Sequence, residues 1–239
     1  MYLENVVMDA VEPQRLGRFW EEVVGGERLT DEPDGFETRL TIEGGSVLDL
    51  CFQRVREPAA DPPRLHLDVT GAARQAEEVE RLLGLGARHL DIGQGDVAWV
   101  VLADPEGNPF CVMEDRAAYA RTGPLAALVL HSADPSRDSE LWSWLTGWTE
   151  TPADGSRSLR HPSGSGPLLE LWPEPARKQA AKNRLHLDIR LEAGDDPVVV
   201  AEQIAERGGR RFDPGWGELP WRSYTDPSGN EFCVLPARP

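Results

Sequence analysis

The sequence predicts an α+β fold in two tandem copies, each pairing two units of one strand, one helix and further strands. The first observation is a repeated turn, because residues 104–108 read DPEGN and residues 226–230 read DPSGN, 122 positions later. The second is the motif RLHLD, which recurs 120 positions after its first occurrence. A nearly constant offset indicates a duplicated domain. We therefore expect two copies, residues 1–118 and 124–239, arranged as an internal pseudo-dimer within one chain.

Each unit is predicted from the periodicity of its apolar residues. Residues 13–26 carry apolar side chains at helical spacing and end in two glycines, which is typical of an amphipathic helix. Residues 46–53 alternate apolar and polar side chains, which predicts a half-buried strand. The first helix should bury Leu16, Phe19, Trp20 and Val23, and the second Ala72, Ala76, Val79 and Leu83. Equivalent helices are expected around 141–148 and 200–204.

The repeated turn has a local physical explanation. An aspartate caps its own backbone, proline presets φ at the next position, and glycine adopts the left-handed conformation that returns the chain antiparallel. We expect Asn108 and Asn230 to hold the two turns. The DPxGN motif therefore predicts a hairpin before the last strand of each copy.

Composition limits the classes of partner. The formal charge of −16, with no basic cluster, argues against nucleic acid, because phosphates would be repelled. No stretch approaches the length of apolar sequence that crosses a bilayer, so no membrane partner is expected. The first residues show no basic segment followed by an apolar run, so a cytoplasmic location is expected. The three cysteines are widely spaced with no CxxC pair, which indicates reduced thiols. The abundance of Ala, Arg, Gly and Pro favours a GC-rich bacterial source.

Polar side chains gather on one face of several predicted strands. In RLHLD, strand alternation sets the apolar residues on one side and the histidine and aspartate on the other, in both copies. Glu170 and Trp172 share a face of their strand, and Cys111 and Cys233 lie opposite their flanking Phe and Val residues. The histidines could bind a ligand or only be hydrogen bonded in a wet cavity. The buried thiols could be small apolar fillers.

The element order and three motifs resemble a known superfamily. The chain resembles vicinal oxygen chelate proteins in its order of strand, helix and three strands, repeated in pairs. The resemblance extends to three motifs, which are FW in the first helix, LHLD at the start of the second unit and DPxGN before the last strand. The superfamily includes glyoxalase I, bleomycin resistance proteins and extradiol dioxygenases. The resemblance covers nearly the whole chain and implies paired βαβββ modules that form curved mixed sheets, each enclosing a cup.

The resemblance also implies positions for a metal. Metal-dependent members take ligands from the first and last strands of each unit. Carried over, these positions give Asn5, Asp49, His66 and Cys111 in the first copy, and Ala127, Glu170, His186 and Cys233 in the second. Neither set has the usual His and Glu pattern. A divalent metal in the second copy is left open, with Glu170, His186 and His131 as its candidate ligands.

The function expected from these features is binding of a small organic ligand in a cup, as in bleomycin-resistance-type proteins. Aromatic walls beside a carboxylate suit a flat or cationic molecule. The second copy should carry the working site, because it alone adds Trp216 to its loop. The expected ligand-binding residues are Glu170, Trp172, His186, Trp216, Cys233, His66, Asp49 and Cys111. A metal-dependent lyase, isomerase or dioxygenase, and a non-catalytic structural or regulatory module, remain alternatives, so whether the chain is an enzyme stays open.

Overall fold

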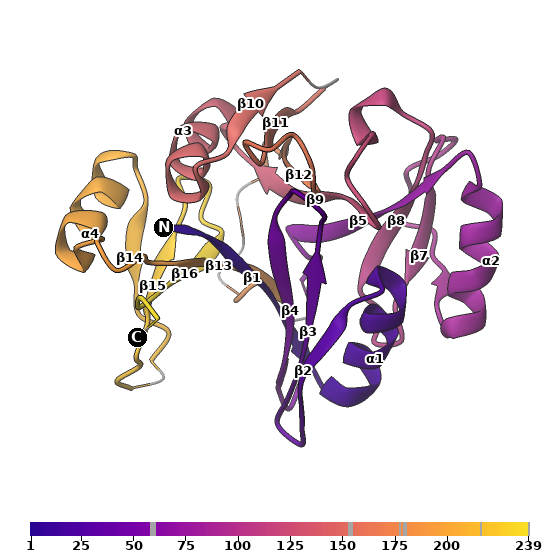
Figure 1. Ribbon diagram of the computed structural model, residues 1–239, viewed down its shortest axis with the longest axis horizontal. Helices are drawn as coiled ribbons and strands as arrows, with labels where there is room; N and C mark the ends of the chain where they lie inside the picture. The colour runs from indigo at the N-terminus through magenta and orange to yellow at the C-terminus, as the bar shows by residue number, and fades with distance from the viewer. Residues whose placement is uncertain (58–60, 153–154, 177, 179–180, 216, 239) are drawn as a thin grey trace.

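Four βαβββ modules follow one another along the chain in the computed structural model (Figure 1). The structure describes residues 1–57, 61–152, 155–176, 178, 181–215 and 217–238. None of the helices in these ranges is long and apolar enough to cross a membrane. The predicted α+β class, with paired modules and mixed sheets, is confirmed.

The first two modules occupy the first copy. Module one contains β1 (Tyr2–Ala10), α1 (Pro13–Val24), β2 (Glu27–Glu32), β3 (Gly35–Thr41) and β4 (Val47–Arg54). Module two contains β5 (Leu65–Ala72), α2 (Gln75–Leu85), β6 (Arg88–His89), β7 (Val100–Ala103) and β8 (Pro109–Glu114). A 3-10 turn, Ala117–Tyr119, lies in the connection to the second copy.

The second copy repeats the plan. Module three contains β9 (Leu125–Ser132), α3 (Pro135–Thr146), β10 (Thr149–Thr151), β11 (Arg157–Arg160) and β12 (Leu168–Pro173). Module four contains β13 (Leu185–Arg190), α4 (Pro197–Glu206), β14 (Arg210–Phe212), β15 (Arg222–Thr225) and β16 (Glu231–Leu235).

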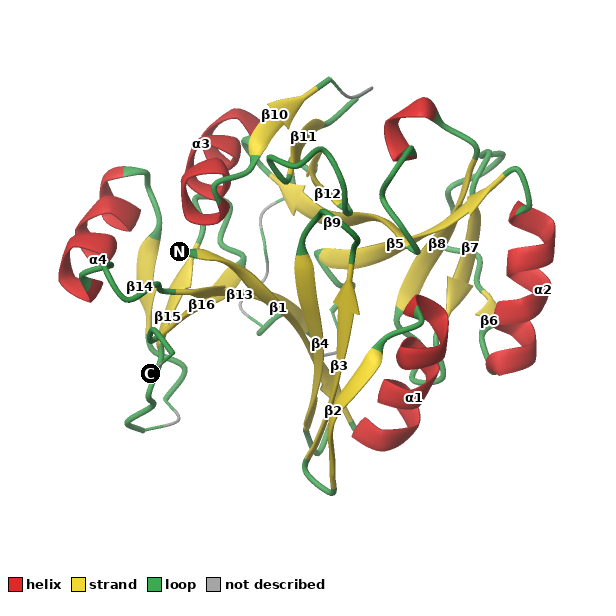
Figure 2. Cartoon of the chain, in the orientation of Figure 1, coloured by secondary structure: helices red, strands yellow, loops and turns green. Residues whose placement is uncertain are grey.

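The modules join across the two copies and not within each copy. The terminal sheet combines modules four and one in the order β14-β15-β16-β13-β1-β4-β3-β2. The central sheet combines modules three and two in the order β10-β11-β12-β9-β5-β8-β7-β6 (Figure 2). The expectation that each copy would build its own cup is therefore corrected. The residue boundaries of the copies, 1–118 and 124–239, stay a prediction.

An open strand edge explains this pairing. Within every module the first strand pairs on only one side, with the last strand of the same module, and leaves its other edge free. β1 covers its free edge with β13, and β5 covers its edge with β9, both antiparallel. β5 (LHLDVTGA) and β13 (LHLDIR) share the same alternating motif, so their periodicity does not distinguish which of them will meet β1.

The helices pack against one face of each sheet and leave the other face for the cups. α1 begins with Pro13 and ends before Gly25, which has a left-handed φ of 64°, as the sequence predicted. The predicted stripe of α1 is fully buried. The stripe of α2 is partly wrong, because Ala72 belongs to β5, Ala76 is exposed, and Val79 and Leu82 are the buried residues.

The DPxGN turn also connects the two modules of a copy. Asp104 accepts hydrogen bonds from the backbone N–H groups of Glu106 and Asn108, and Gly107 has a φ of 86°. Its second oxygen accepts a bond of 3.2 Å from the indole of Trp20 on α1. The same bond joins Trp142 to Asp226 in the second copy at 3.3 Å. The FW and DPxGN motifs therefore belong to one contact, made twice.

A second pair of contacts joins the copies to each other. Arg64 donates to the side-chain oxygen of Asn230 at 3.0 Å and to the carbonyl of His131 at 3.0 Å. In the reciprocal contact, Arg184 donates to Asn108 at 3.1 Å. The arginine that opens each RLHLD motif thus reaches the turn of the opposite copy, which stabilises the pseudo-symmetric arrangement.

Candidate functional site

Each sheet has a cup on the face that its helices leave open, and these are called the central cup and the terminal cup after their sheets. Strand register defines the floor of the central cup. His66 on β5 and Glu170 on β12 are both paired with Val129 on β9, so they flank it in one row across three strands. In the neighbouring row, Asp68 pairs with Cys111 on one side and with Ala127 on the other. Side chains two residues apart share a face. Both rows therefore point into the same cup.

A cavity of about 160 Å³ lies over these rows. Its aromatic and titratable lining includes His66, Trp99, Tyr119, His131, Glu170 and Trp172. Trp172 is 38% exposed at the rim, whereas Glu170 is only 6% exposed at the floor. The cup thus combines a buried carboxyl group with accessible indole surface.

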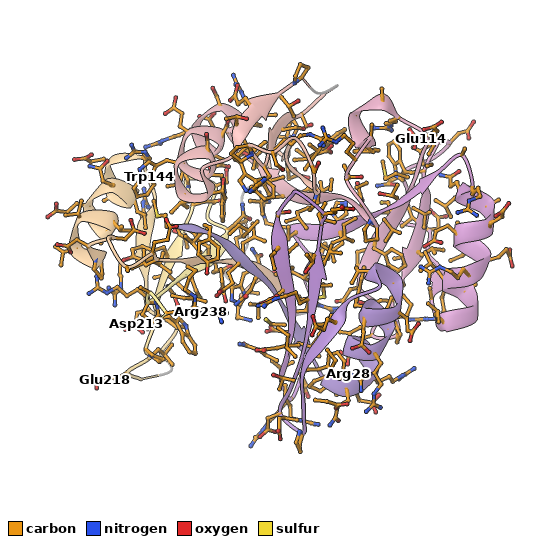
Figure 3. All side chains as sticks on the ribbon, viewed as in Figure 1. Arg28, Glu114, Trp144, Asp213, Glu218 and Arg238 are labelled. Atoms are coloured by element: carbon orange, nitrogen blue, oxygen red, sulfur yellow. The ribbon has the colours of Figure 1, made fainter. Side chains whose placement is uncertain are left out.

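Glu170 lies in an environment that resists its ionisation. Burial raises the pKa of Glu170, and the nearby Arg116 and Tyr119 partly oppose that rise. Arg116 lies over the rings of Trp99 and Tyr119, 5.6 Å from each centroid. It also pairs with Glu114, which ends β8 (Figure 3). The guanidinium of Arg116 therefore contacts the rings of Trp99 and Tyr119 and lies near Glu170.

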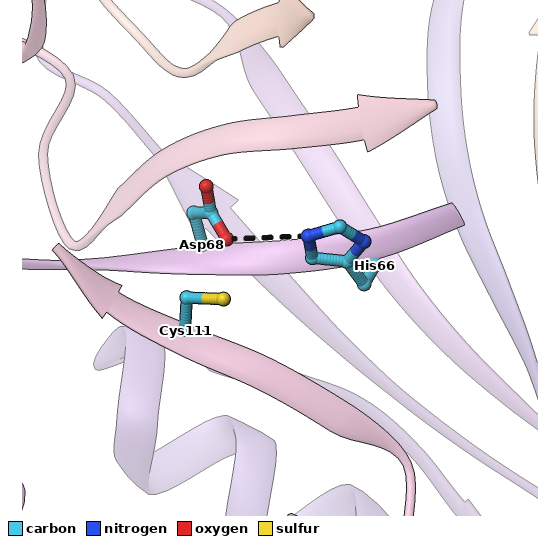
Figure 4. Close-up of side chains that lie close together, drawn as sticks. All are labelled: His66, Asp68 and Cys111. Atoms are coloured by element: carbon cyan, nitrogen blue, oxygen red, sulfur yellow. Dashed lines mark ion pairs between the residues drawn. The ribbon is translucent and has the colours of Figure 1, made fainter. Parts of the chain in front are cut away.

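His66, Asp68 and Cys111 form a compact cluster on the cup floor (Figure 4). Nε2 of His66 lies 3.6 Å from Oδ1 of Asp68. Burial, and to a lesser extent His131, lowers the pKa of His66 to about 3, and the two imidazole centroids are 5.8 Å apart. Burial and Glu170 raise the pKa of Asp68, and burial and Asp68 raise the pKa of Cys111. At neutral pH the imidazole is uncharged and the thiol is protonated, which argues against a nucleophilic cysteine.

The terminal cup repeats this cluster with different electrostatics. His186, Asp188 and Cys233 lie together, and Nε2 of His186 is 3.4 Å from Oδ1 of Asp188. Burial opposes charge on His186, but Asp188 and Cys233 outweigh it and raise its pKa to about 10. Asn5 donates to the other oxygen of Asp188 at 3.0 Å. A cavity of about 250 Å³ covers this cluster.

The structure separates several residues that the sequence grouped together. Glu170, Trp172, His66, Cys111 and His131 line the central cup, whereas His186 and Cys233 line the terminal cup. The predicted metal set of Glu170, His186 and His131 does not assemble, because β13 belongs to a different sheet from β9 and β12. Trp216 lies outside the described residues.

The predicted equivalence of Asp49 and Glu170 is also corrected. Register pairs Val7 with Cys51 and Val129 with Glu170, so Cys51 is the counterpart of Glu170. Asp49 instead accepts two hydrogen bonds of 2.7 Å from Arg39 and lines a separate cavity. Its carboxylate is already engaged.

Two lining residues escaped the sequence reasoning. Arg116 and Tyr119 come from the segment between the copies, which the sequence indicated only as a boundary. This segment has no helical or strand periodicity, so nothing in its pattern points to a cup. The aromatic residue in it was the one available signal.

Comparisons with known proteins agree with this architecture. A model of the glyoxalase-like domain matches the chain twice, at residues 5–113 and 127–235. Glyoxalase I from Zea mays shares the fold with a TM-score of 0.67 and 16% identity, covering 98% of this chain and 92% of that one. A putative dioxygenase from Bacillus subtilis gives a TM-score of 0.62 and 16% identity, covering 100% and 86%. No curated protein sequence matches. The chain belongs to the glyoxalase-like domain family of the vicinal oxygen chelate superfamily and carries its domain twice.

Proposed function

We propose that this protein binds a small organic molecule in the central cup. The observation that supports this most directly is the placement of buried Glu170 on the floor of a cavity whose rim and walls are Trp172, Trp99 and Tyr119. A ring can stack on the indoles while a polar group reaches the carboxyl.

The cavity favours a flat ligand with a hydrogen-bond donor or a positive charge. Its volume of about 160 Å³ encloses a small ring, and the exposed face of Trp172 can hold the part of the ligand that extends beyond it. A cationic or donor group next to Glu170 would stabilise its ionised form, which burial disfavours. The formal charge of −16 would attract a cation and not an anion.

Ligand screening by tryptophan fluorescence tests this proposal. A ligand that stacks in the cup should quench the emission, and Trp172→Ala should weaken its binding by roughly tenfold, about 1 kcal/mol or more. Glu170→Gln should weaken a cationic ligand by a similar factor, because it removes the charge and keeps the shape. Gln53→Ala is the matched control, since Gln53 follows Cys51 in the terminal cup as Trp172 follows Glu170. A ligand that responds to Gln53→Ala and not to Trp172→Ala would place binding in the other cup.

A metal-dependent lyase, isomerase or dioxygenase is the second candidate. It is favoured by the donor cluster of His186, Asp188 and Cys233. A metal bound there would supply Lewis acidity to an oxygen-bearing substrate. Turnover that requires an added divalent ion would support this candidate, and ligand binding without turnover under the same conditions would favour the first.

We also propose a cytoplasmic location, supported by Cys51, Cys111 and Cys233, which are all free thiols. Thiol labelling of denatured protein taken directly from cells would find three reactive groups per chain if they remain reduced.

A further inference from the structure

A third cavity, of about 420 Å³, lies between module one and module three and is called the inter-module cavity. Module one lines it with residues of β1, β3 and the start of β4, among them Tyr2, Arg39 and Val47. Module three lines it with Trp148, which follows α3, and His161, which follows β11. Among the described residues, it shares none of its lining with either cup.

The two carboxylates of the inter-module cavity are already paired. Glu4 and Asp49 are each 4% exposed. Glu4 accepts from Arg190 at 2.6 Å, and from Nε and Nη2 of Arg238 at 3.1 and 2.9 Å. Asp49 accepts from Nε and Nη2 of Arg39, both at 2.7 Å. Three guanidinium groups thus surround two carboxylates, which leaves one positive charge in excess at this place.

Two of these guanidinium groups retain an unused donor. Arg39 and Arg238, which follows β16 and is labelled in Figure 3, both bind their acid through Nε and Nη2. Within the part of the chain that the structure describes, Nη1 of each has no acceptor. Hydrogen bonds to Glu4 raise the pKa of Arg238, and the charge of Arg39 opposes that rise, so the two cations repel each other. An anion between them would relieve this repulsion.

Two ring N–H groups add to the surplus of donors. The backbone N–H of Ser163 donates to Nδ1 of His161 at 3.3 Å, and burial lowers the pKa of His161. The neutral ring therefore carries its proton on Nε2. Neither Nε2 of His161 nor Nε1 of Trp148, a residue only 3% exposed, has a hydrogen-bond partner among the described residues. The lining thus favours a ligand that brings acceptor oxygens.

The inter-module cavity also has an apolar side. Tyr2 and Val47 line it and are 39% and 46% exposed. Apolar surface next to a few convergent polar groups is typical of a site for a small organic molecule.

We propose that the inter-module cavity binds a small organic acid, with its carboxylate between Arg39 and Arg238 and its apolar body against Tyr2 and Val47. A guanidinium group matches a carboxylate in both charge and geometry. The net charge of −16 opposes an anion only weakly at this distance, because salt screens charges beyond about 10 Å at roughly 0.1 M ionic strength. The site is additional to the central cup, whose buried acid suits a donor or a cation.

Calorimetric titration with four probes tests this assignment. Benzoate and hexanoate carry a carboxylate on an apolar body, benzamide has the same ring as benzoate without the charge, and inorganic phosphate has charge without an apolar body. We expect the two carboxylates to bind saturably at one equivalent per chain, and benzamide and phosphate to bind more weakly.

Arg238→Gln should weaken benzoate binding by roughly tenfold, because it removes a charged donor from the carboxylate. The fold should tolerate this change, since Arg238 is 59% exposed and Glu4 keeps its bond to Arg190. Arg15→Gln is the matched control, because Arg15 is 60% exposed, pairs with Glu12 on the surface and does not line the inter-module cavity. It should leave the affinity for benzoate unchanged.

A second pair of variants adds a negative charge. Val47→Glu should weaken benzoate binding by repulsion, whereas Val199→Glu, at an equally exposed position of α4, should not. The proposal is overturned if neither carboxylate binds, or if benzamide or phosphate binds as tightly as benzoate. It is also overturned if Arg238→Gln has no more effect than Arg15→Gln, or Val47→Glu no more than Val199→Glu.

Discussion

Replacing Asp138 by asparagine is expected to make the protein more stable above pH 7. Asp138 on α3 is fully buried, and its Oδ2 accepts hydrogen bonds from the hydroxyls of Ser132, at 2.5 Å, and Ser228. Its neighbour is Asp226 of the second turn, which is 2% exposed. Burial, and next the charge of Asp138, raise the pKa of Asp226 to about 7. Burial also raises the pKa of Asp138.

The sign and size of the effect follow from this shift. An acid whose pKa is higher in the folded state destabilises the fold as pH rises from its unfolded pKa toward its folded pKa. For Asp226 this window runs from 3.8 to about 7, a penalty on the order of 4 kcal/mol once both states are ionised. The part due to Asp138 is smaller than the part due to burial. We expect removal of the Asp138 charge to recover roughly 1–2 kcal/mol at pH 8 and almost nothing at pH 4, where Asp226 is protonated and is not repelled.

Urea unfolding followed by tryptophan fluorescence at several pH values measures this difference. Asparagine can still accept from Ser132 and Ser228, and its amide would occupy the place of Oδ1, which has no hydrogen-bond partner among the residues that the structure describes. Glu140→Gln is the control, because it removes the same charge from an exposed position of the same helix. If Asp138→Asn were equally destabilising at pH 4 and pH 8, repulsion between the two carboxyls would not be the cause.

Two further changes test other contacts. Trp20→Phe should lower the free energy of unfolding by roughly 2–3 kcal/mol, because it leaves Asp104 short of the indole donor and opens space in the core. Trp144→Phe, at the half-buried tryptophan labelled in Figure 3, should cost less than about 1 kcal/mol in the same urea assay, and equal losses would refute this account.

The sequence predicted local structure better than it predicted how the modules pair. Helical spacing identified the buried face of α1, and the DPxGN turn formed for the expected reasons. Alternation correctly set His66 and Asp68 on the cup side of β5. Each of these depends on residues close together in the chain.

The errors concern relations between distant segments. The choice of β13 as the partner of β1 depends on which free edges meet, and the two candidate partners, β5 and β13, carry the same LHLD motif. The equivalence of Glu170 failed because Cys51 follows the end of α1 by 27 residues, whereas Glu170 follows the end of α3 by 24. A constant offset between the two copies therefore assigns the wrong counterpart to a residue on the strand that follows the shortened hairpin. The contribution of Tyr119 depends on the path of a connection that has no periodic pattern.

The pairing of modules across the copies has a consequence for how the two cups can differ. Two separate chains, each with one copy, would associate through the same strand edges and enclose two identical cups, so every substitution would appear in both. In a single chain each wall of each cup is encoded by its own codons. Asn5 can then face one aspartate while Ala127 faces the other, and Cys51 in the terminal cup can occupy the place that Glu170 has in the central cup. Tandem duplication thus lets two cups acquire separate side-chain chemistries while one shared scaffold holds both.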